Sequence, residues 1–158
     1  MRAWPLTIIL LAGMLLPSGA CSDGAEPSVD GPLPTLEVGY DGGTLIAEIA
    51  RSPEERGVGL SKRDQLAADA AMLFDLGDTR IPAFWMKDMR FTLDMLFIGE
   101  DKRIVSITAD VQPEPGVADA ALRRYSPPSA VRYVLELNGR AALRLGLDAG
   151  DELSLELP

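Results

Sequence analysis

Apolar residues concentrate in one stretch, Met72–Ile98, and this stretch most constrains what the chain can fold into. It holds three apolar runs and four of the six Met residues, and its one Trp is the only Trp outside the first few residues. It also places Lys87 and Asp94 among apolar neighbours, where a charge needs a partner. Short apolar runs of this kind, separated by turn signals, are typical of buried strands.

Two of these runs predict a β-hairpin, with Ala83–Asp88 and Leu93–Ile98 as its strands and residues 89–92 as the loop. In this register Lys87 faces Asp94, and directly opposed side chains lie on the same sheet face. One face then collects a core: Phe84, Met86, Leu93, Met95 and Phe97. The other face collects Trp85, Lys87, Asp94 and Leu96.

The second face is a candidate ligand platform. Trp85 would stack on the ligand, while Lys87 and Asp94 would orient a polar group. In the alternative interpretation, Trp85 packs under a helix and the ion pair satisfies itself. A cross-strand pair of opposite charge contributes only about 0.2–1 kcal/mol, so stability alone is a weak reason for it.

Two further chemistries stay open at the same stretch. Met86 and Met95 would be neighbours, and thioethers can hold Cu(I), although Met is more often a gap-filler in cores. Four acids near predicted strand ends, Asp75, Asp78, Asp88 and Asp94, offer a carboxylate pair of the kind that hydrolyses glycosidic bonds. Solvated loop positions would also explain these acids.

The remainder of the chain predicts a mainly β fold. Asp41-Gly42-Gly43 between two extended runs is a hairpin signal, and Ser52-Pro53-Glu54-Glu55 is a capping box that begins a short helix. Residues 130–137 read as a strand, after which Asn138 would cap a second short helix that stops at Gly146. Seven or eight short strands predict an antiparallel β-sandwich with two short helices.

Composition excludes several kinds of site. The chain of 158 residues has no His and one Cys, so a Ser-His-Asp triad, a Cys-His dyad and an intrachain disulfide are impossible. No cofactor and no thiolate or imidazole metal site is expected in the folded part. A net charge of −9 argues against nucleic acid as a partner. Enzymatic activity stays undecided, with these absences weighing against it.

The amino terminus predicts an export signal. A basic residue, an apolar run and small residues lead to Cys21, a pattern that resembles the lipobox of bacterial lipoproteins, although Ser18 stands where Leu is usual. We therefore expect a signal peptide over residues 1–20, a lipidated Cys21 with a flexible tether over 21–34, and a β domain over 35–158. A cleaved signal without a lipid and an uncleaved anchor are the alternatives.

The folded part resembles the DUF192 family, through MLFDLGDTRIPAFWMKDMRFTLDMLFIGEDKRIVSI and the flanking SPEERGVGLSKRDQL and YSPPSAVRYVLELNGRAALRLGLDAGD. The resemblance implies a jelly-roll-like β-sandwich, frequent export signals and no established activity. It points to Arg56, Trp85, Met86, Lys87 and Asp94, and an Arg at the first of these positions would suit a carboxylate or phosphate. Ala71 and Asp88-Met89 depart from the family's usual Gly and Asn-Thr.

Together these observations predict a lipid-anchored protein of the bacterial cell envelope that faces the periplasm. It would be a binding or accessory module that uses Arg56, Trp85, Lys87 and Asp94. Its partners would be the membrane, through the lipid on Cys21, and an unknown small ligand or envelope protein. The alternative is a carboxylate-dependent hydrolase of an envelope polymer, and a flat apolar patch would instead indicate a protein partner.

Overall fold

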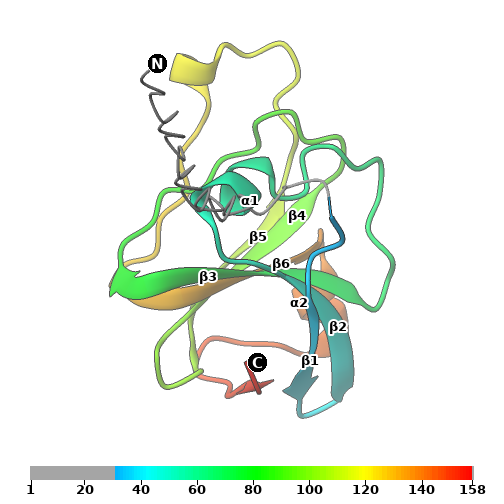
Figure 1. Cartoon of the computed structure of the whole chain (residues 1–158), viewed down its shortest axis with the longest axis vertical. Helices are drawn as coiled ribbons and strands as arrows, with labels where there is room; N and C mark the ends of the chain where they lie inside the picture. Colours follow the sequence, from blue (N-terminus) through cyan, green and yellow to red (C-terminus); the bar gives the residue numbers. More distant parts are fainter. Residues whose placement is uncertain (1–30, 158) are drawn as a thin grey trace, which may run out of the picture.

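The structure, a computed structural model, describes residues 31–157 (Figure 1). The expected signal peptide, Cys21 and most of the expected tether lie outside the described residues. In order, the elements are β1 (Thr35–Tyr40), β2 (Gly43–Ala50), α1 (Pro53–Val58), β3 (Ala70–Arg80), β4 (Leu93–Ile98), β5 (Ile104–Val111), the 3-10 helix η1 (Asp119–Ala121), β6 (Val131–Asn138), α2 (Ala141–Leu145) and β7 (Ser154–Leu155).

The strands form one seven-stranded sheet in the order β5-β4-β6-β3-β2-β1-β7. The predicted mainly β fold with two short helices is confirmed. The sheet is mixed, however, because β2 and β3 pair in parallel while the other pairs are antiparallel. A parallel pair needs a long crossover, and here α1 and the chain up to residue 69 provide it. The expectation of purely antiparallel pairing was wrong at this connection.

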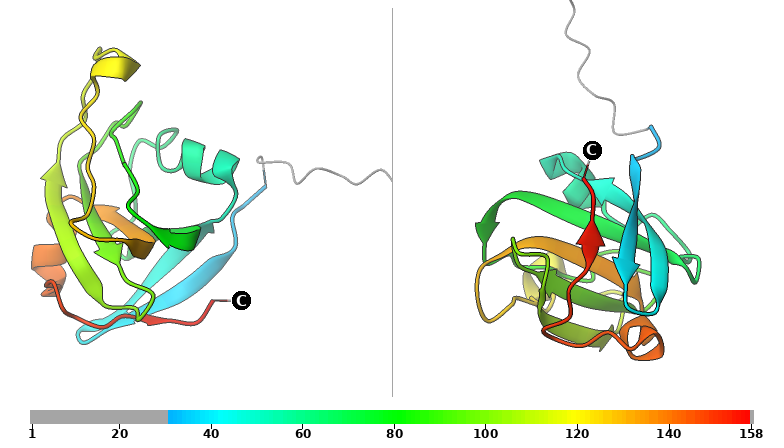
Figure 2. Two further views of the ribbon diagram at one scale, coloured as in Figure 1. Left: turned by 90° about the vertical axis from the view of Figure 1, so that its left-hand side faces the viewer. Right: turned by 90° about the horizontal axis from the view of Figure 1, so that it is seen from below.

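The sheet curls, so that the start of β5 meets the chain just before β7 (Figure 2). Arg103 and Glu152 form an antiparallel bridge, and the Leu153 N–H donates to the Lys102 carbonyl at 3.0 Å. The chain that leads into the last strand therefore ties the two ends of the sheet together.

Both faces of the central strands are buried, which explains why their sequences are apolar without a clean alternation. The α2-side cluster consists of Leu36, Val38, Leu45, Ala47, Ile49, Ala71, Leu73, Leu96, Ile98, Ile104, Tyr133, Leu135, Leu137, Ala141, Ala142, Leu147, Leu153 and Leu155. The α1-side cluster consists of Ala50, Leu60, Leu66, Met72, Phe74, Leu76, Met86, Leu93, Met95, Phe97, Val111, Val131 and Val134. All six residues of β4 are buried between them.

The predicted central hairpin was wrong. β4 pairs with β5 on one edge and β6 on the other, so neither edge is left for residues 83–88. That segment is not a strand, and its bridge runs instead from Phe84 to Tyr125. The five apolar side chains predicted to share a core do meet on the α1 side, because the segment lies over that face. The prediction of which apolar side chains share a face is therefore confirmed, and the predicted pairing of residues 83–88 with β4 was wrong.

Local signals were more reliable. Asp41 and Gly42 connect β1 to β2 as a two-residue turn, and the capping box forms, since Ser52 Oγ accepts from the Glu55 N–H at 3.0 Å and Glu55 Oε2 accepts from the Ser52 N–H at 2.8 Å. Gly146 ends α2 with φ of 69°. Asn138, however, does not cap α2, since its amide donates to the carbonyls of residues 66 and 67.

Candidate functional site

Asp94 lies fully buried on the α2 side of the sheet. Its Oδ1 accepts from the backbone N–H of Asp110 at 2.7 Å and of Arg140 at 2.9 Å, and its Oδ2 accepts from the Ala142 N–H at 2.8 Å. Asp110 and Arg140 both have positive φ, 54° and 65°. The carboxylate therefore fixes two left-handed residues and the start of α2, which is a structural role.

Lys87 lies far from this carboxylate, so the predicted Lys87–Asp94 pair was wrong. Lys87 Nζ contacts Asp119 Oδ2 at 2.5 Å, and both side chains are largely exposed. The adjacent Trp85 is 42% exposed, and the guanidinium carbon of Arg124 lies 3.8 Å from the centre of its ring. Both supporting residues come from the long excursion between β5 and β6, which projects at the top of Figure 1.

A cavity of about 310 Å³ nevertheless brings together three of the four predicted site residues, Arg56, Trp85 and Lys87. It lies on the α1 side of the sheet, and its lining comes largely from the chain around α1 and from the segment that follows β3. The lining residues are Arg56, Gly57, Val58, Gly59, Leu60, Ser61, Phe74, Leu76, Arg80, Pro82, Ala83, Phe84, Trp85, Lys87, Met89 and Glu136. Asp94 is not among them.

Glu136 is the residue of this cavity that the sequence analysis missed. It lies on β6 with Met72 of β3 and Met95 of β4 as its neighbours across the strands, and only 4% of its surface is exposed. No hydrogen bond or ion pair to its carboxyl forms within residues 31–157, and burial raises its pKa to about 8. The signal was present: an acid stands inside the strongly apolar run VRYVLELN.

Arg56 is held in place by backbone carbonyls. Its Nη1 donates to the carbonyl of Asp75 at 3.0 Å and to that of Arg51. The Asp75 carboxylate in turn pairs with Arg132. The hydrogen bonds of Arg56 run to neutral carbonyls, and backbone hydrogen bonds, with a smaller contribution from its charge, lower the pKa of the adjacent Glu55 carboxyl. Arg56 therefore lines the cavity as a cation that Glu55 partly offsets.

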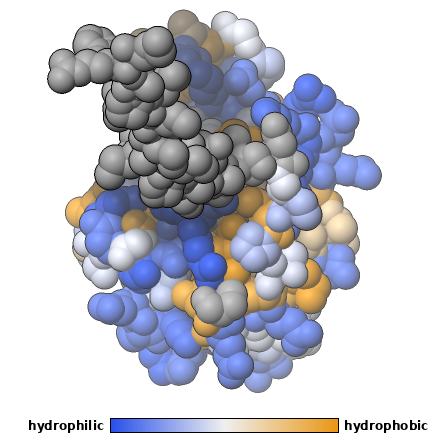
Figure 3. All heavy atoms as spheres, in the orientation of Figure 1, coloured by the Kyte–Doolittle hydropathy of each residue, from blue (hydrophilic) through white to orange (hydrophobic). Residues whose placement is uncertain are grey.

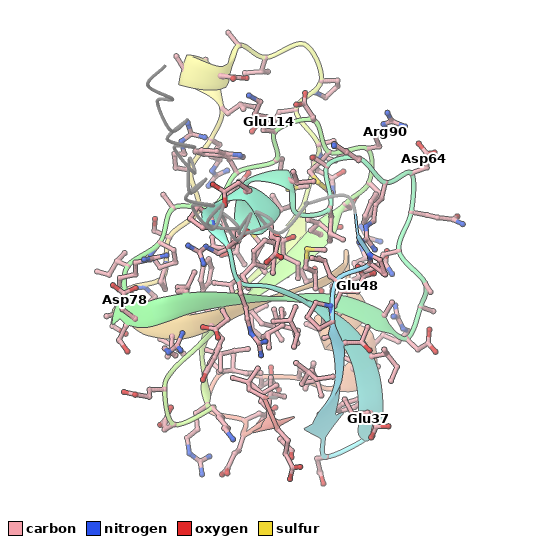
Figure 4. All side chains as sticks on the ribbon, in the orientation of Figure 1. Glu37, Glu48, Asp64, Asp78, Arg90 and Glu114 are labelled. Atoms are coloured by element: carbon pink, nitrogen blue, oxygen red, sulfur yellow. The ribbon has the colours of Figure 1, made fainter. Side chains whose placement is uncertain are left out.

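The other cations of the lining pair with exposed acids. Arg80 Nη1 lies 2.8 Å from Oδ1 of Asp78, which Figure 4 labels at the end of β3. Asp78 and Asp119 are 67% and 68% exposed, so water and salt weaken both pairs. Three cationic side chains therefore surround a cavity whose single acidic residue, among the described lining residues, is a buried Glu.

The other predicted chemistries find less support in the geometry. Three of the four candidate acids have partners, since Asp75 and Asp78 pair with Arg side chains and Asp94 binds backbone amides. Asp88, whose backbone φ is 55°, lines a separate cavity. Met86 and Met95 are both buried in the α1-side cluster, where they fill the core, and Cu(I) binding by this pair stays a prediction.

The exposed apolar side chains do not gather into one patch. Those of large size in the described part come from four different segments, because two of them share the connection between β3 and β4: Ile46, Ile81, Trp85, Val117 and Leu143. Figure 3 shows hydrophilic residues over much of one face of the domain, with smaller apolar areas among them. This distribution favours a pocket over a flat protein-binding face.

Comparisons with known proteins extend over the whole described domain. The profile of the family DUF192, described as "Uncharacterized ACR", matches residues 36–155. A protein from Sinorhizobium meliloti 1021, described as a "putative transcription regulator", is 37% identical, with a TM-score of 0.66 over 75% of this chain and 89% of its own. A protein of unknown function from Novosphingobium aromaticivorans DSM 12444 is 26% identical, with a TM-score of 0.69 over 91% of this chain and 100% of its own. No curated protein matches.

Proposed function

We propose that this chain, which belongs to the DUF192 family, is a lipid-anchored protein of the cell envelope that binds a small organic ligand in the Arg56–Glu136 cavity. One observation carries the binding part of the proposal. Glu136, only 4% exposed, lines a cavity with Arg56, Trp85 and Lys87, and its carboxyl group has no hydrogen-bond or ion-pair partner within residues 31–157. Burying such a group costs free energy, and a ligand that bonds to it would offset that cost.

The cavity has the size and composition of a small-molecule site. Its volume, about 310 Å³, falls at the lower end of the range for ligand pockets. Phe74, Leu76 and Phe84 provide apolar walls, and the few polar groups stand among them. In such sites the apolar walls bury most of the ligand surface, and the few polar groups provide orientation and specificity.

The amino-terminal sequence supports the envelope part of the proposal. An apolar run and small residues precede Cys21, the residue that would carry the lipid. None of the helices within residues 31–157 is long and apolar enough to cross a membrane. An acylated Cys21 would supply anchoring by another route.

The hydrolase alternative is weaker because its mechanism needs two carboxyl groups about the scissile bond. Glu136 is the single acid among the described residues that line the cavity. A binding role needs only the one group, so the cavity supports it better.

A ligand screen on the full chain in mild detergent tests the proposal. Thermal unfolding, followed by Trp fluorescence, would be measured against a panel of small organic acids, amines, sugars and metal ions. A ligand at about 100 times its Kd should stabilise the chain by about 2.7 kcal/mol, which raises Tm by several degrees.

Two variants locate the binding. Arg56→Ala removes a cavity cation and should abolish the rise in Tm. Leu143→Ala, at an 84% exposed side chain on α2, is the matched control and should preserve it. A panel without any stabilising ligand, or a rise in Tm that survives Arg56→Ala and Trp85→Ala together, would contradict binding in this cavity.

A further inference from the structure

The surroundings of Glu136 indicate which kind of ligand the cavity takes. The residues directly opposite Glu136 on the two neighbouring strands are Met72 and Met95, and neither carries a charge. The charged groups that share its cavity are Arg56 from α1, Arg80 from the end of β3 and Lys87 from the segment beyond it. All three are cations.

Despite these cations, Glu136 remains predominantly neutral at pH 7. Burial raises its pKa to about 8, and no cation of the described residues lies close enough to pair with it. A neutral carboxyl group carries an O–H donor, which an ionised carboxylate lacks. The cavity therefore presents a hydrogen-bond donor at a buried position and positive charge around it.

We propose that the cavity recognises a small organic carboxylate with an apolar or aromatic body, whose carboxylate accepts a hydrogen bond from the Glu136 acid group and is attracted by Arg56. This inference rests on the proposed function, since it specifies the ligand of the same cavity. An O–H···O⁻ bond is charge-assisted and stronger than a bond between neutral groups. Arg56 adds a planar donor that suits carboxylates.

An ammonium ligand is the main competitor, because it would ionise Glu136 and pair with it. The three cations of the lining oppose this occupant, and in a partly desolvated cavity their repulsion is weakly screened. The same cations favour an anion. The charge of the lining therefore selects the carboxylate.

The cavity volume favours a small ligand. About 310 Å³ corresponds to roughly ten water molecules at about 30 Å³ each, which suits a single ring with its acid group. Phe74, Phe84 and Trp85 would contact the body of such a ligand. Ring-to-ring contacts of this kind add to the burial of apolar surface.

Three planar probes of nearly equal shape test the inference: benzoate, benzamide and benzamidine, which are an anion, a neutral molecule and a cation. Their Kd values would be measured on the full chain in mild detergent by calorimetry and by Trp fluorescence, between pH 6 and pH 9. Benzoate should bind at least tenfold more tightly than either analogue at pH 7. Its affinity should fall about tenfold between pH 7 and pH 9, as Glu136 loses the donated proton.

Glu136→Gln is the decisive variant, because an amide donates a hydrogen bond at every pH. It should retain benzoate binding within about threefold at pH 7 and remove the fall above pH 8. Circular dichroism at each pH confirms that the chain is folded. Glu136→Leu, which keeps the volume and lacks the donor, should lose benzoate.

Each other outcome overturns the inference in a distinguishable way. Preferential binding of benzamidine that disappears in Glu136→Gln would identify a cation site and leave the ligand-binding function standing. Equal binding of benzoate and benzamide would remove the role of charge. Failure of all three probes, with a stabilising non-carboxylate found in the wider panel, would refute the ligand class alone. Failure of the wider panel as well would refute the proposed function.

Discussion

Asp94 and Ala142 are joined by a hydrogen bond of 2.8 Å between a buried carboxylate oxygen and a backbone N–H, 48 residues apart in sequence. The bond connects β4 to the first turn of α2, whose own N-cap position has no side-chain hydrogen bond. Asp94, from a distant strand, thus accepts the hydrogen bond at the start of α2 that a neighbouring Ser or Asp usually accepts as the N-cap residue. It explains why Asn138, the expected cap, is free to bind elsewhere.

Asp94→Ala should lower the free energy of unfolding by about 3 kcal/mol, because three backbone N–H groups lose a charged acceptor inside the protein. Chemical denaturation of the variant and the parent chain measures this. Ligand affinity at the cavity should not change, since Asp94 lies on the other face of the sheet. A loss below 1 kcal/mol would show that these bonds contribute little.

Glu136→Gln should change how stability depends on pH. In the parent chain the folded-state pKa of Glu136, about 8, lies above the ordinary value of 4.5 for a Glu carboxyl, because the group is buried. The folded state then holds the proton more tightly between these values, so stability is fully present below pH 4.5 and falls as pH rises to about 8. The slope approaches about 1.4 kcal/mol per pH unit at most.

The measurement for this variant is Tm from pH 4.5 to pH 9, compared with the parent chain. The advantage of the Gln variant should grow with pH and level off above pH 8. A difference between the two chains that is constant with pH would mean that the Glu136 pKa is unshifted.

Trp85→Ala should leave the fold intact and abolish ligand binding. The side chain is 42% exposed and its main partner is Arg124, so the loss of that cation–π contact costs about 1 kcal/mol. Tm measures the first effect and calorimetric titration the second. Unfolding of the variant would instead show that Trp85 belongs to the core.

Cys21→Ser should release the protein from membranes, because the expected lipid is attached to that sulfur. Fractionation of cells that express the two chains, followed by detection of the protein in soluble and membrane fractions, measures the change. Retention of the Ser variant in the membrane fraction would refute the lipid anchor. The fold of the domain should be the same in both.

Features set by neighbouring residues were predictable from the sequence. The bounds of β4, the Ser52 capping box and the stop at Gly146 depend on chain segments of a few residues, and all three are as expected. The apolar set of the α1 side was also predictable, since alternation identifies which side chains share a face.

Pairing between distant segments was not predictable in the same way. Apolar and polar residues alternate over residues 83–88, a pattern that suits both a paired strand and an extended segment lying across a sheet. The second arrangement forms because β5 and β6 already occupy both edges of β4. The wrong pairing misplaced Asp94 in the predicted site. The acid inside the apolar run of β6 was a local signal for Glu136, but its place in a cavity was not predictable, because α1 and the segment after β3 build the other walls.

The curl of the sheet would have a consequence if the proposed lipid anchor concentrates copies of the protein on a membrane surface. Residues 150–153 already occupy the beginning of β5, and the β4–β5 ladder is interrupted twice by shifts in register. An irregular, partly occupied border is a poor template for a strand from a neighbouring molecule. Copies anchored side by side would therefore resist edge-to-edge aggregation, even at high local density.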